Sequence, residues 1–117
     1  MSRIGIFLDR IGISILALGA IGHTFGAVKS YAGEPVILVW SLCATALVAL
    51  AAGLNFLRAA RPGDRPVAWL ASLATACWLA ASVGFGLAIG KPFDPRVVLF
   101  AVACLLLLAS NLRALRS

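Results

Sequence analysis

The sequence predicts an all-α membrane protein, a four-transmembrane-helix antiparallel bundle that forms a single transmembrane domain over residues 1–117. Hydrophobic residues make up 62% of the chain and charged residues only 12%. A soluble domain of this size cannot bury so much apolar surface, so the solvent for these side chains must be lipid. The apolar residues also collect in four long segments, each long enough or nearly so to cross roughly 30 Å of hydrocarbon.

Short runs of charge, glycine and proline separate the four segments, which are expected to span approximately residues 11–28, 35–57, 67–89 and 97–112. The first segment follows Arg3 and Arg10 and so resembles a secretory signal peptide. Asp9 lies within the would-be basic region, which argues against cleavage. We therefore expect this segment to be retained as the first helix.

An acidic residue beside a proline marks the start of each later helix. Glu34, Asp64 and Asp94 each lie one or two residues before a proline. The acid can cap the free backbone N–H groups or complement their positive charge, and proline in the first turn gives up a donor that has no partner there. Because the loops between spans are short, neighbouring helices should pack antiparallel.

The net charge of +6 is distributed unevenly between the two ends of such a bundle. Loops rich in lysine and arginine face the cytoplasm, so both termini should be cytoplasmic. Because this orientation is enough to explain the positive charge, we expect no nucleic-acid partner. We expect Arg58, Arg61 and Arg65 to form a solvated patch near lipid headgroups. One end would carry Arg3, Arg10, Arg58, Arg61, Arg65, Arg113 and Arg116, and the other Lys29, Lys91 and Arg96.

The two halves of the chain echo each other. Asp9-Arg10 opens the first half and Asp64-Arg65 the second, and Asn55 and Asn111 each precede an arginine-containing helix end. The pattern indicates a duplicated helical hairpin, or a chance recurrence of residues common in membrane proteins. The two asparagines either terminate their spans or form hydrogen bonds across helices.

Glycines recur every seven residues along the first helix, at Gly5, Gly12, Gly19 and Gly26, and Gly22 completes a G-x-x-x-G pair with Gly26. A glycine face lets another backbone approach closely. The stripe therefore predicts either packing inside the monomer or a homodimer through Gly12, Gly19, Gly22 and Gly26. The third helix carries a similar row of small residues, so we expect the first and third helices to pair across the bundle.

His23 is the single histidine of the chain and lies inside the first span, on its glycine face. A polar residue at such depth is a functional hypothesis by default. Counting residues from the loops predicts a mostly apolar pocket with one directional polar group, which suits a lipophilic ligand. The alternative is that His23 bonds a backbone carbonyl or Trp40, and that Trp40 is an interfacial belt residue. The predicted ligand-binding residues are His23, Thr24, Trp40, Ser41, Phe85 and Phe100.

The remaining residues do not predict catalysis or a metal site. The three cysteines, Cys43, Cys77 and Cys104, are widely spaced with no C-x-x-C pair, and one histidine without a nearby carboxylate or thiolate does not form a zinc or iron site. The sequence contains no recognisable nucleophile–base pair, paired carboxylates or phosphate loop. An enzyme is therefore disfavoured, and the cofactor remains unknown.

The run from Arg10 through Gly12 to Gly19 and His23 resembles the first helix of the small four-helix DoxX-like bacterial integral membrane proteins. The second helix, with Leu57-Arg58 and a short arginine-rich turn after it, is also similar to that family. An acidic residue often seen within the second helix of the family has no counterpart here. The resemblance implies a bacterial inner-membrane bundle with a quinone or redox association.

Taken together, these observations predict an inner-membrane protein that binds a lipophilic ligand, a lipid or a quinone-like molecule, in an outer-half pocket near His23. It would act either as a binding protein by itself or as an accessory subunit. Two alternatives stay open: a dimeric small-molecule transporter, and a structural or assembly protein of the membrane.

Overall fold

The computed structural model describes residues 2–117, and all the regular structure in this range is helical. The helices are α1 (Arg3–Tyr31), α2 (Pro35–Ala60), α3 (Arg65–Ala88) and α4 (Pro95–Arg116). Each of the four is long and apolar enough to cross a membrane. The predicted all-helical architecture with four candidate spans is therefore confirmed.

The first helix begins earlier than its apolar segment, at Arg3 instead of residue 11. Ser2 caps it, since its hydroxyl accepts a hydrogen bond from the backbone N–H of Gly5 at 3.0 Å. Gly5 and Asp9 are buried, so these added turns pack into the molecule. The charged residues around Asp9 interrupt the apolar pattern, which explains why the sequence placed the start too late.

Acidic caps form at two of the three predicted positions. The Asp64 carboxylate accepts from the N–H of Val67 at 3.2 Å, and Asp94 accepts from the N–H of Arg96 at 2.9 Å. Glu34 makes no such side-chain bond at the start of α2. The predicted helix starts are therefore confirmed at all three acids, with a side-chain capping bond at α3 and α4 and none at α2.

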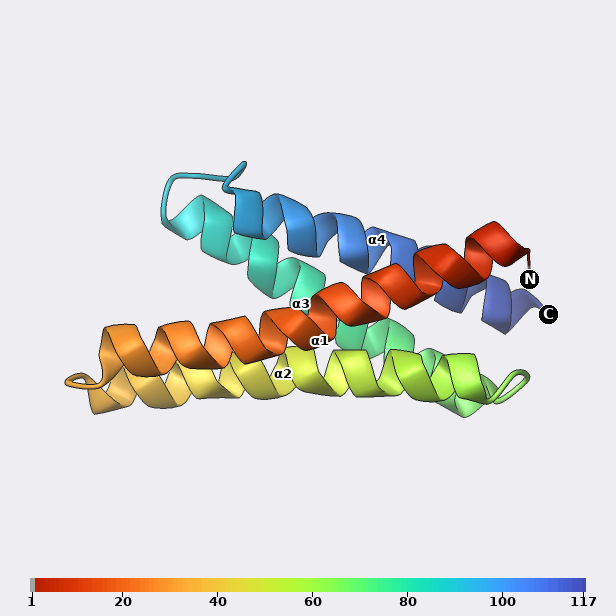
Figure 1. Ribbon diagram of the computed structural model, residues 1–117, viewed down its shortest axis with the longest axis horizontal. Helices are drawn as coiled ribbons and strands as arrows, with labels where there is room; N and C mark the ends of the chain where they lie inside the picture. The colour runs from red at the N-terminus through yellow and green to blue at the C-terminus, as the bar shows by residue number, and fades with distance from the viewer. Residues whose placement is uncertain (1) are drawn as a thin grey trace.

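The chain runs along the molecule four times, so both termini lie at the same end (Figure 1). We call this the terminal end; it also holds the connection between α2 and α3. The opposite end holds the α1–α2 and α3–α4 connections. The molecule measures 48 × 24 × 19 Å along its principal axes.

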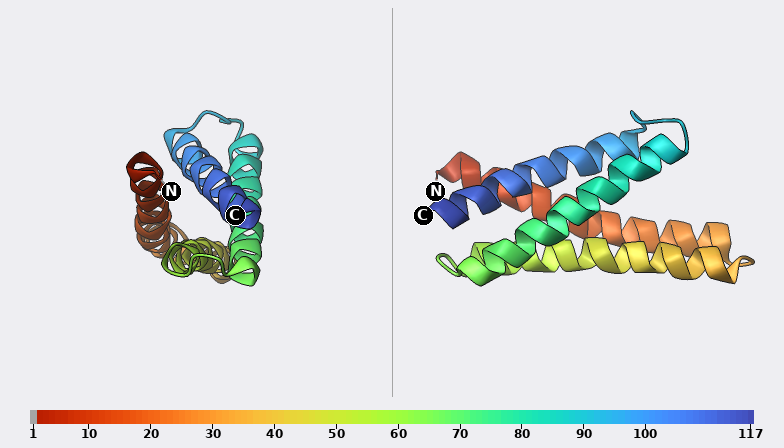
Figure 2. Two further views of the ribbon diagram at one scale, coloured as in Figure 1. Left: turned by 90° about the vertical axis from the view of Figure 1, so that its right-hand side faces the viewer. Right: turned by 180° about the vertical axis from the view of Figure 1, so that it is seen from behind.

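Each helix packs against its neighbours in the chain, and α4 also packs against α1. Toward the opposite end, the α1–α2 hairpin diverges from the α3–α4 hairpin (Figures 1 and 2). Consistent with this divergence, no α2 residue before Val48 is buried. The core therefore lies in the middle of the molecule and extends toward the terminal end, around Leu16, Val48, Ala51, Cys104 and Leu107.

The predicted pairing of the first and third helices is wrong. Within the described residues, no Cα atom of α1 comes within 8 Å of one in α3, whereas α2 and α4 do approach each other. The glycine face of α1 explains the difference, because it receives side chains of α4. A Cβ atom at Gly12 would lie 2.9 Å from Leu107 Cγ, and one at Gly19 would meet the ring of Phe100.

Candidate functional site

His23 is held by a residue of α2 that the sequence did not single out. Its Nδ1 lies 2.7 Å from the hydroxyl oxygen of Thr45. The Thr45 hydroxyl in turn donates to the carbonyl of Ser41 at 3.4 Å. In its Nδ1–H tautomer, His23 would donate to Thr45 and leave Nε2 as a hydrogen-bond acceptor.

The His23 ring also meets an aromatic pair from α3 and α4. Its centroid lies 6.1 Å from that of Trp78 in an edge-to-face arrangement. Trp78 stands edge-to-face against Phe100 at 5.1 Å. His23, Thr45, Trp78 and Phe100 therefore connect all four helices in one cluster, which we call the His23 cluster.

Two buried donors of α3 have no partner within the described residues, one within the His23 cluster and one a helical turn beyond it. Trp78 is 4% exposed and Ser82, one helical turn further along α3, is 5% exposed. Neither the indole N–H of Trp78 nor the hydroxyl of Ser82 makes a hydrogen bond within the described residues. Buried donors are nearly always paired, so each of these two lacks the acceptor that a buried donor normally has.

The structure brings only some of the predicted ligand-binding residues to this cluster. Phe100 joins through Trp78, and Ser41 contributes its carbonyl. The Thr24 hydroxyl donates instead to Ala20 of its own helix at 2.8 Å. The side chain of Trp40 is 72% exposed, so it is not the partner of His23.

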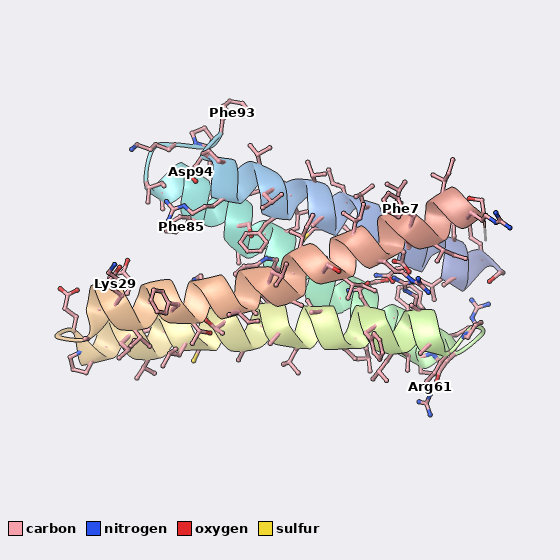
Figure 3. All side chains as sticks on the ribbon, viewed as in Figure 1. Phe7, Lys29, Arg61, Phe85, Phe93 and Asp94 are labelled. Carbon is pink, nitrogen blue, oxygen red and sulfur yellow. The ribbon has the colours of Figure 1, made fainter. Side chains whose placement is uncertain are left out.

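Phe85 is 46% exposed and lies beneath the Arg96 guanidinium, whose central carbon is 5.6 Å from the ring centroid. Figure 3 shows Phe85 beside Asp94 at the opposite end of the α3–α4 hairpin. Its contact with Arg96 therefore ties Phe85 to the helix end rather than to His23.

A second polar centre lies near the terminal end, around Arg58. Both terminal nitrogens of its guanidinium donate to the carboxylate of Asp9, at 2.7 Å and 2.6 Å. Arg58 and Asp9 are 5% and 3% exposed. The expectation that Arg58 belongs to a solvated patch is wrong, because it turns inward to this carboxylate. Arg61 does point away from the bundle (Figure 3), and its side chain is 62% exposed.

Two asparagines complete the Arg58 centre. Nε of Arg58 donates to Oδ1 of Asn111 at 2.6 Å, and Nη2 reaches Oδ1 of Asn55 at 3.3 Å. Asn55 donates to the hydroxyl of Thr75 at 2.8 Å, which extends the network to α3. Both asparagines are fully buried, so they form hydrogen bonds across helices, the second of the two roles considered for them.

A recess of about 560 Å³ opens at the terminal end beside this centre. It lies between α1, α2, α4 and the α2–α3 connection, and the Asp9–Arg58 pair forms part of its wall. The lining residues are Ile6, Asp9, Arg10, Arg58, Ala59, Pro62, Gly63, Ser110, Arg113, Ala114 and Ser117. We call it the terminal recess.

Metal ligands do not converge in residues 2–117, where no group of three or more histidine, cysteine or acidic side chains could hold an ion. Cys43 and Cys77 are exposed and Cys104 is buried, all as free thiols. In comparisons with known proteins, the chain matches no family model, no curated protein and no solved structure.

Proposed function

We propose that this protein is an integral membrane protein of the bacterial inner membrane, an antiparallel four-helix bundle with both termini in the cytoplasm. The charge distribution supports the orientation, because seven arginines belong to the terminal end and three basic residues to the opposite end. The His23 cluster then lies in the outer half of the bilayer.

The function that the geometry supports best is binding of a lipophilic molecule at the His23 cluster, as an accessory subunit of a membrane system. The observation that carries this proposal is the pair of unpartnered donors on α3, the N–H of Trp78 beside the His23 ring and the O–H of Ser82 one helical turn further along. A buried donor without a partner costs about 1–3 kcal/mol. A carbonyl oxygen from a ligand would remove that cost.

The chemistry of the cluster matches a quinone-like molecule or a lipid ester. Trp78 and Ser82 offer hydrogen bonds to a carbonyl, whereas Nε2 of His23, in the tautomer with its proton on Nδ1, accepts one from a hydroxyl. The same cluster can therefore bind an oxidised carbonyl form and a reduced hydroxyl form. No redox step by the protein is required for this binding.

The opposite end of the molecule offers exposed apolar surface to the apolar part of such a ligand. The opposite-end half of α2, residues 35–47, contains no buried residue, and α1 and α3 carry exposed large apolar side chains at this end, such as Phe25 and Leu87. In a bilayer these surfaces contact acyl or isoprenoid chains instead of water. The ligand would enter sideways from the lipid.

Binding of a decyl-substituted benzoquinone to the detergent-solubilised protein tests this proposal. Replacing Trp40 and Trp69 by phenylalanine leaves Trp78 as the single tryptophan, whose fluorescence the quinone should quench on binding. Ser82→Ala should weaken binding about tenfold, because one hydrogen bond to a buried acceptor is lost. Ser72→Ala is the matched control, since the Ser72 hydroxyl already bonds Ala68 of its own helix at 2.8 Å.

His23→Ala should weaken binding of the reduced quinol more than that of the quinone, because only the quinol has a hydroxyl to donate to Nε2. Equal affinities in the parent protein, Ser82→Ala and His23→Ala would exclude the His23 cluster as the binding site. Weakening by Ser72→Ala as strong as that by Ser82→Ala would also exclude it.

A second candidate is a homodimer, either a small-molecule transporter or a structural assembly, and the open part of the glycine stripe favours it. A Cβ atom at Gly22 or Gly26 would meet nothing within 4 Å, whereas Gly12 and Gly19 are covered by α4. The dimer contact is therefore proposed at Gly22 and Gly26 alone. Gly26→Cys, in a chain whose Cys43 and Cys77 are alanine, should form disulfide-linked dimers in membranes, and Gly33→Cys serves as the control in a connection.

Duplication of a hairpin remains a proposal as well. The equivalent residues Asn55 and Asn111 both accept hydrogen bonds from Arg58, which supports it. The equivalent acids differ, because Asp9 is buried against Arg58 and Asp64 caps a helix. A duplicated ancestor must therefore have diverged at its acidic positions.

A further inference from the structure

We propose that the terminal recess binds one anionic phosphate group, supplied by a lipid headgroup or by free phosphate. Three arginines and one carboxylate line it: Arg10, Arg58, Arg113 and Asp9. Their side chains carry a formal charge of +2. This site is distinct from the His23 cluster and does not depend on the function proposed for it.

The single side-chain carboxylate in the lining does not neutralise the three arginines. Asp9 uses both oxygens on Arg58, in a bidentate ion pair. Arg10 and Arg113 have no carboxylate within 4.0 Å among residues 2–117, where the ion pairs are those of Arg58, Arg61 and Arg96. Arg10 and Arg113 therefore bring two positive charges to the recess without an ion-pair partner within 4.0 Å among the described residues.

Arg58 retains one unused donor in spite of its pairing. A guanidinium has five N–H groups. Nε donates to Asn111, Nη1 to Asp9, and Nη2 to both Asp9 and Asn55. The second N–H of Nη1 therefore has no acceptor among the described residues. Arg58 lines the recess, and its other hydrogen bonds fix the position of its guanidinium.

Ser110 adds a second fixed donor to the wall. It is 1% exposed, and its oxygen accepts a hydrogen bond from Nη2 of Arg113 at 3.1 Å. Within the described residues its hydroxyl hydrogen has no acceptor of its own. The bond also holds the Arg113 guanidinium at the recess, so less side-chain freedom is lost on binding an anion.

Phosphate fits this donor set better than a planar carboxylate does. The donors come from three helices, with Arg10 on α1, Arg58 on α2, and Ser110 and Arg113 on α4. A tetrahedral phosphate has acceptor oxygens in several directions, whereas a carboxylate presents two in one plane. The recess volume of about 560 Å³ admits a phosphate together with the glycerol of a headgroup.

Thermal unfolding of the protein in maltoside detergent measures this binding with three probes. They are short-chain phosphatidylglycerol, short-chain phosphatidylcholine, and inorganic phosphate compared with chloride at equal ionic strength. Phosphatidylglycerol should raise the unfolding temperature more than phosphatidylcholine does. The lipid concentration that gives half of the full rise measures its affinity. A rise with inorganic phosphate as well would identify free phosphate as a ligand, and a rise with phosphatidylglycerol alone would identify the lipid.

The variant Arg10→Gln/Arg113→Gln leaves the buried Asp9–Arg58 pair intact and should weaken binding about tenfold or more. Its matched control is Arg3→Gln/Arg116→Gln, which removes the same charge from the same two helices at exposed positions outside the recess. The control should change affinity less than twofold. Equal weakening in both variants would show that general surface charge attracts the lipid, and no shift with any of the probes would also overturn the proposal.

Discussion

Arg58 of α2 and Asp9 of α1 form a buried, bidentate ion pair with N–O distances of 2.7 Å and 2.6 Å. The same guanidinium bonds Asn111 of α4 and, through Asn55, connects to Thr75 of α3. One charged side chain therefore joins all four helices near the terminal end. Because both charges are removed from water, each depends on the other for its stability.

Removal of one member of this pair should destabilise the protein strongly. Asp9→Asn leaves the Arg58 charge buried without compensation, and we expect it to lower the free energy of unfolding by about 3–5 kcal/mol. The double variant Asp9→Leu/Arg58→Met removes both charges and should recover most of this loss. Reversible unfolding in mixed detergent and sodium dodecyl sulfate micelles, followed by circular dichroism, measures the difference.

The exposed pair of Arg61 and Asp64 is the internal control. Its N–O distance is 3.6 Å and the Arg61 side chain is 62% exposed, so Arg61→Gln should cost less than about 1 kcal/mol. If Asp9→Asn costs no more than Arg61→Gln, the buried pair does not hold the helices together.

The hydrogen bond between Asn55 and Thr75 should contribute a smaller amount. Thr75→Val keeps the shape of the side chain but removes the acceptor of the Asn55 amide at 2.8 Å. We expect a loss of about 1 kcal/mol, in the range found for hydrogen bonds between membrane helices. Thr75→Ser keeps the hydroxyl and separates this loss from that of packing.

Thr24→Val is the matched control for Thr75→Val, because the Thr24 hydroxyl bonds only the Ala20 carbonyl of its own helix. It should change the unfolding free energy by a few tenths of a kcal/mol at most. A cost for Thr24→Val equal to that for Thr75→Val would mean that the contact between α2 and α3 contributes no stability.

The glycines of α1 should differ in their tolerance of a methyl group. Gly12→Ala places a Cβ atom 2.9 Å from Leu107 Cγ and 3.4 Å from the Ala103 carbonyl, so we expect a loss of about 1–3 kcal/mol. Gly22→Ala meets nothing within 4 Å and should gain up to about 1 kcal/mol from helix propensity. Unfolding of both variants at a concentration where the protein is monomeric makes the comparison, and a loss at Gly22 equal to that at Gly12 would contradict it.

The sequence predicted where the helices lie along the chain better than which side of each helix packs inward. Long apolar segments and acid–proline starts located the four spans within a few residues, apart from the first turns of α1. Apolar residues surround each helix, however, so no polar face shows which side turns inward. For this reason Arg58 looked like a solvated residue, although Asp9 and Arg58 were both expected at the same end of the bundle.

The His23 contact shows a smaller error of the same kind. Counting residues from the loops placed Trp40 and Ser41 at the level of His23, whereas the partner is Thr45, one helical turn further along α2. An axial offset of one turn between packed helices cannot be obtained from residue counts, because it depends on how side chains interlock. The one sequence signal for this partner was that Thr45 is a polar residue one helical turn from the predicted level.

The start of α4 should respond to acid through Asp94. Hydrogen bonds from the side chain and the backbone N–H of Arg96 hold the pKa of Asp94 below its ordinary value. The ionised cap therefore contributes stability above the pKa of Asp94 in the unfolded chain, and this contribution is lost as the pH falls through the lowered pKa of the folded protein. Arg96→Gln should move the pKa of Asp94 upward, so the cap is lost at a higher pH. The carboxyl carbon chemical shift of Asp94, titrated by NMR in micelles, measures this change.

Lys91→Gln is the control for Arg96→Gln. It should move the pKa of Asp94 much less, because Lys91 acts on Asp94 only through its charge. An equal effect of the two substitutions would mean that net charge, not the Arg96 hydrogen bonds, sets this pKa.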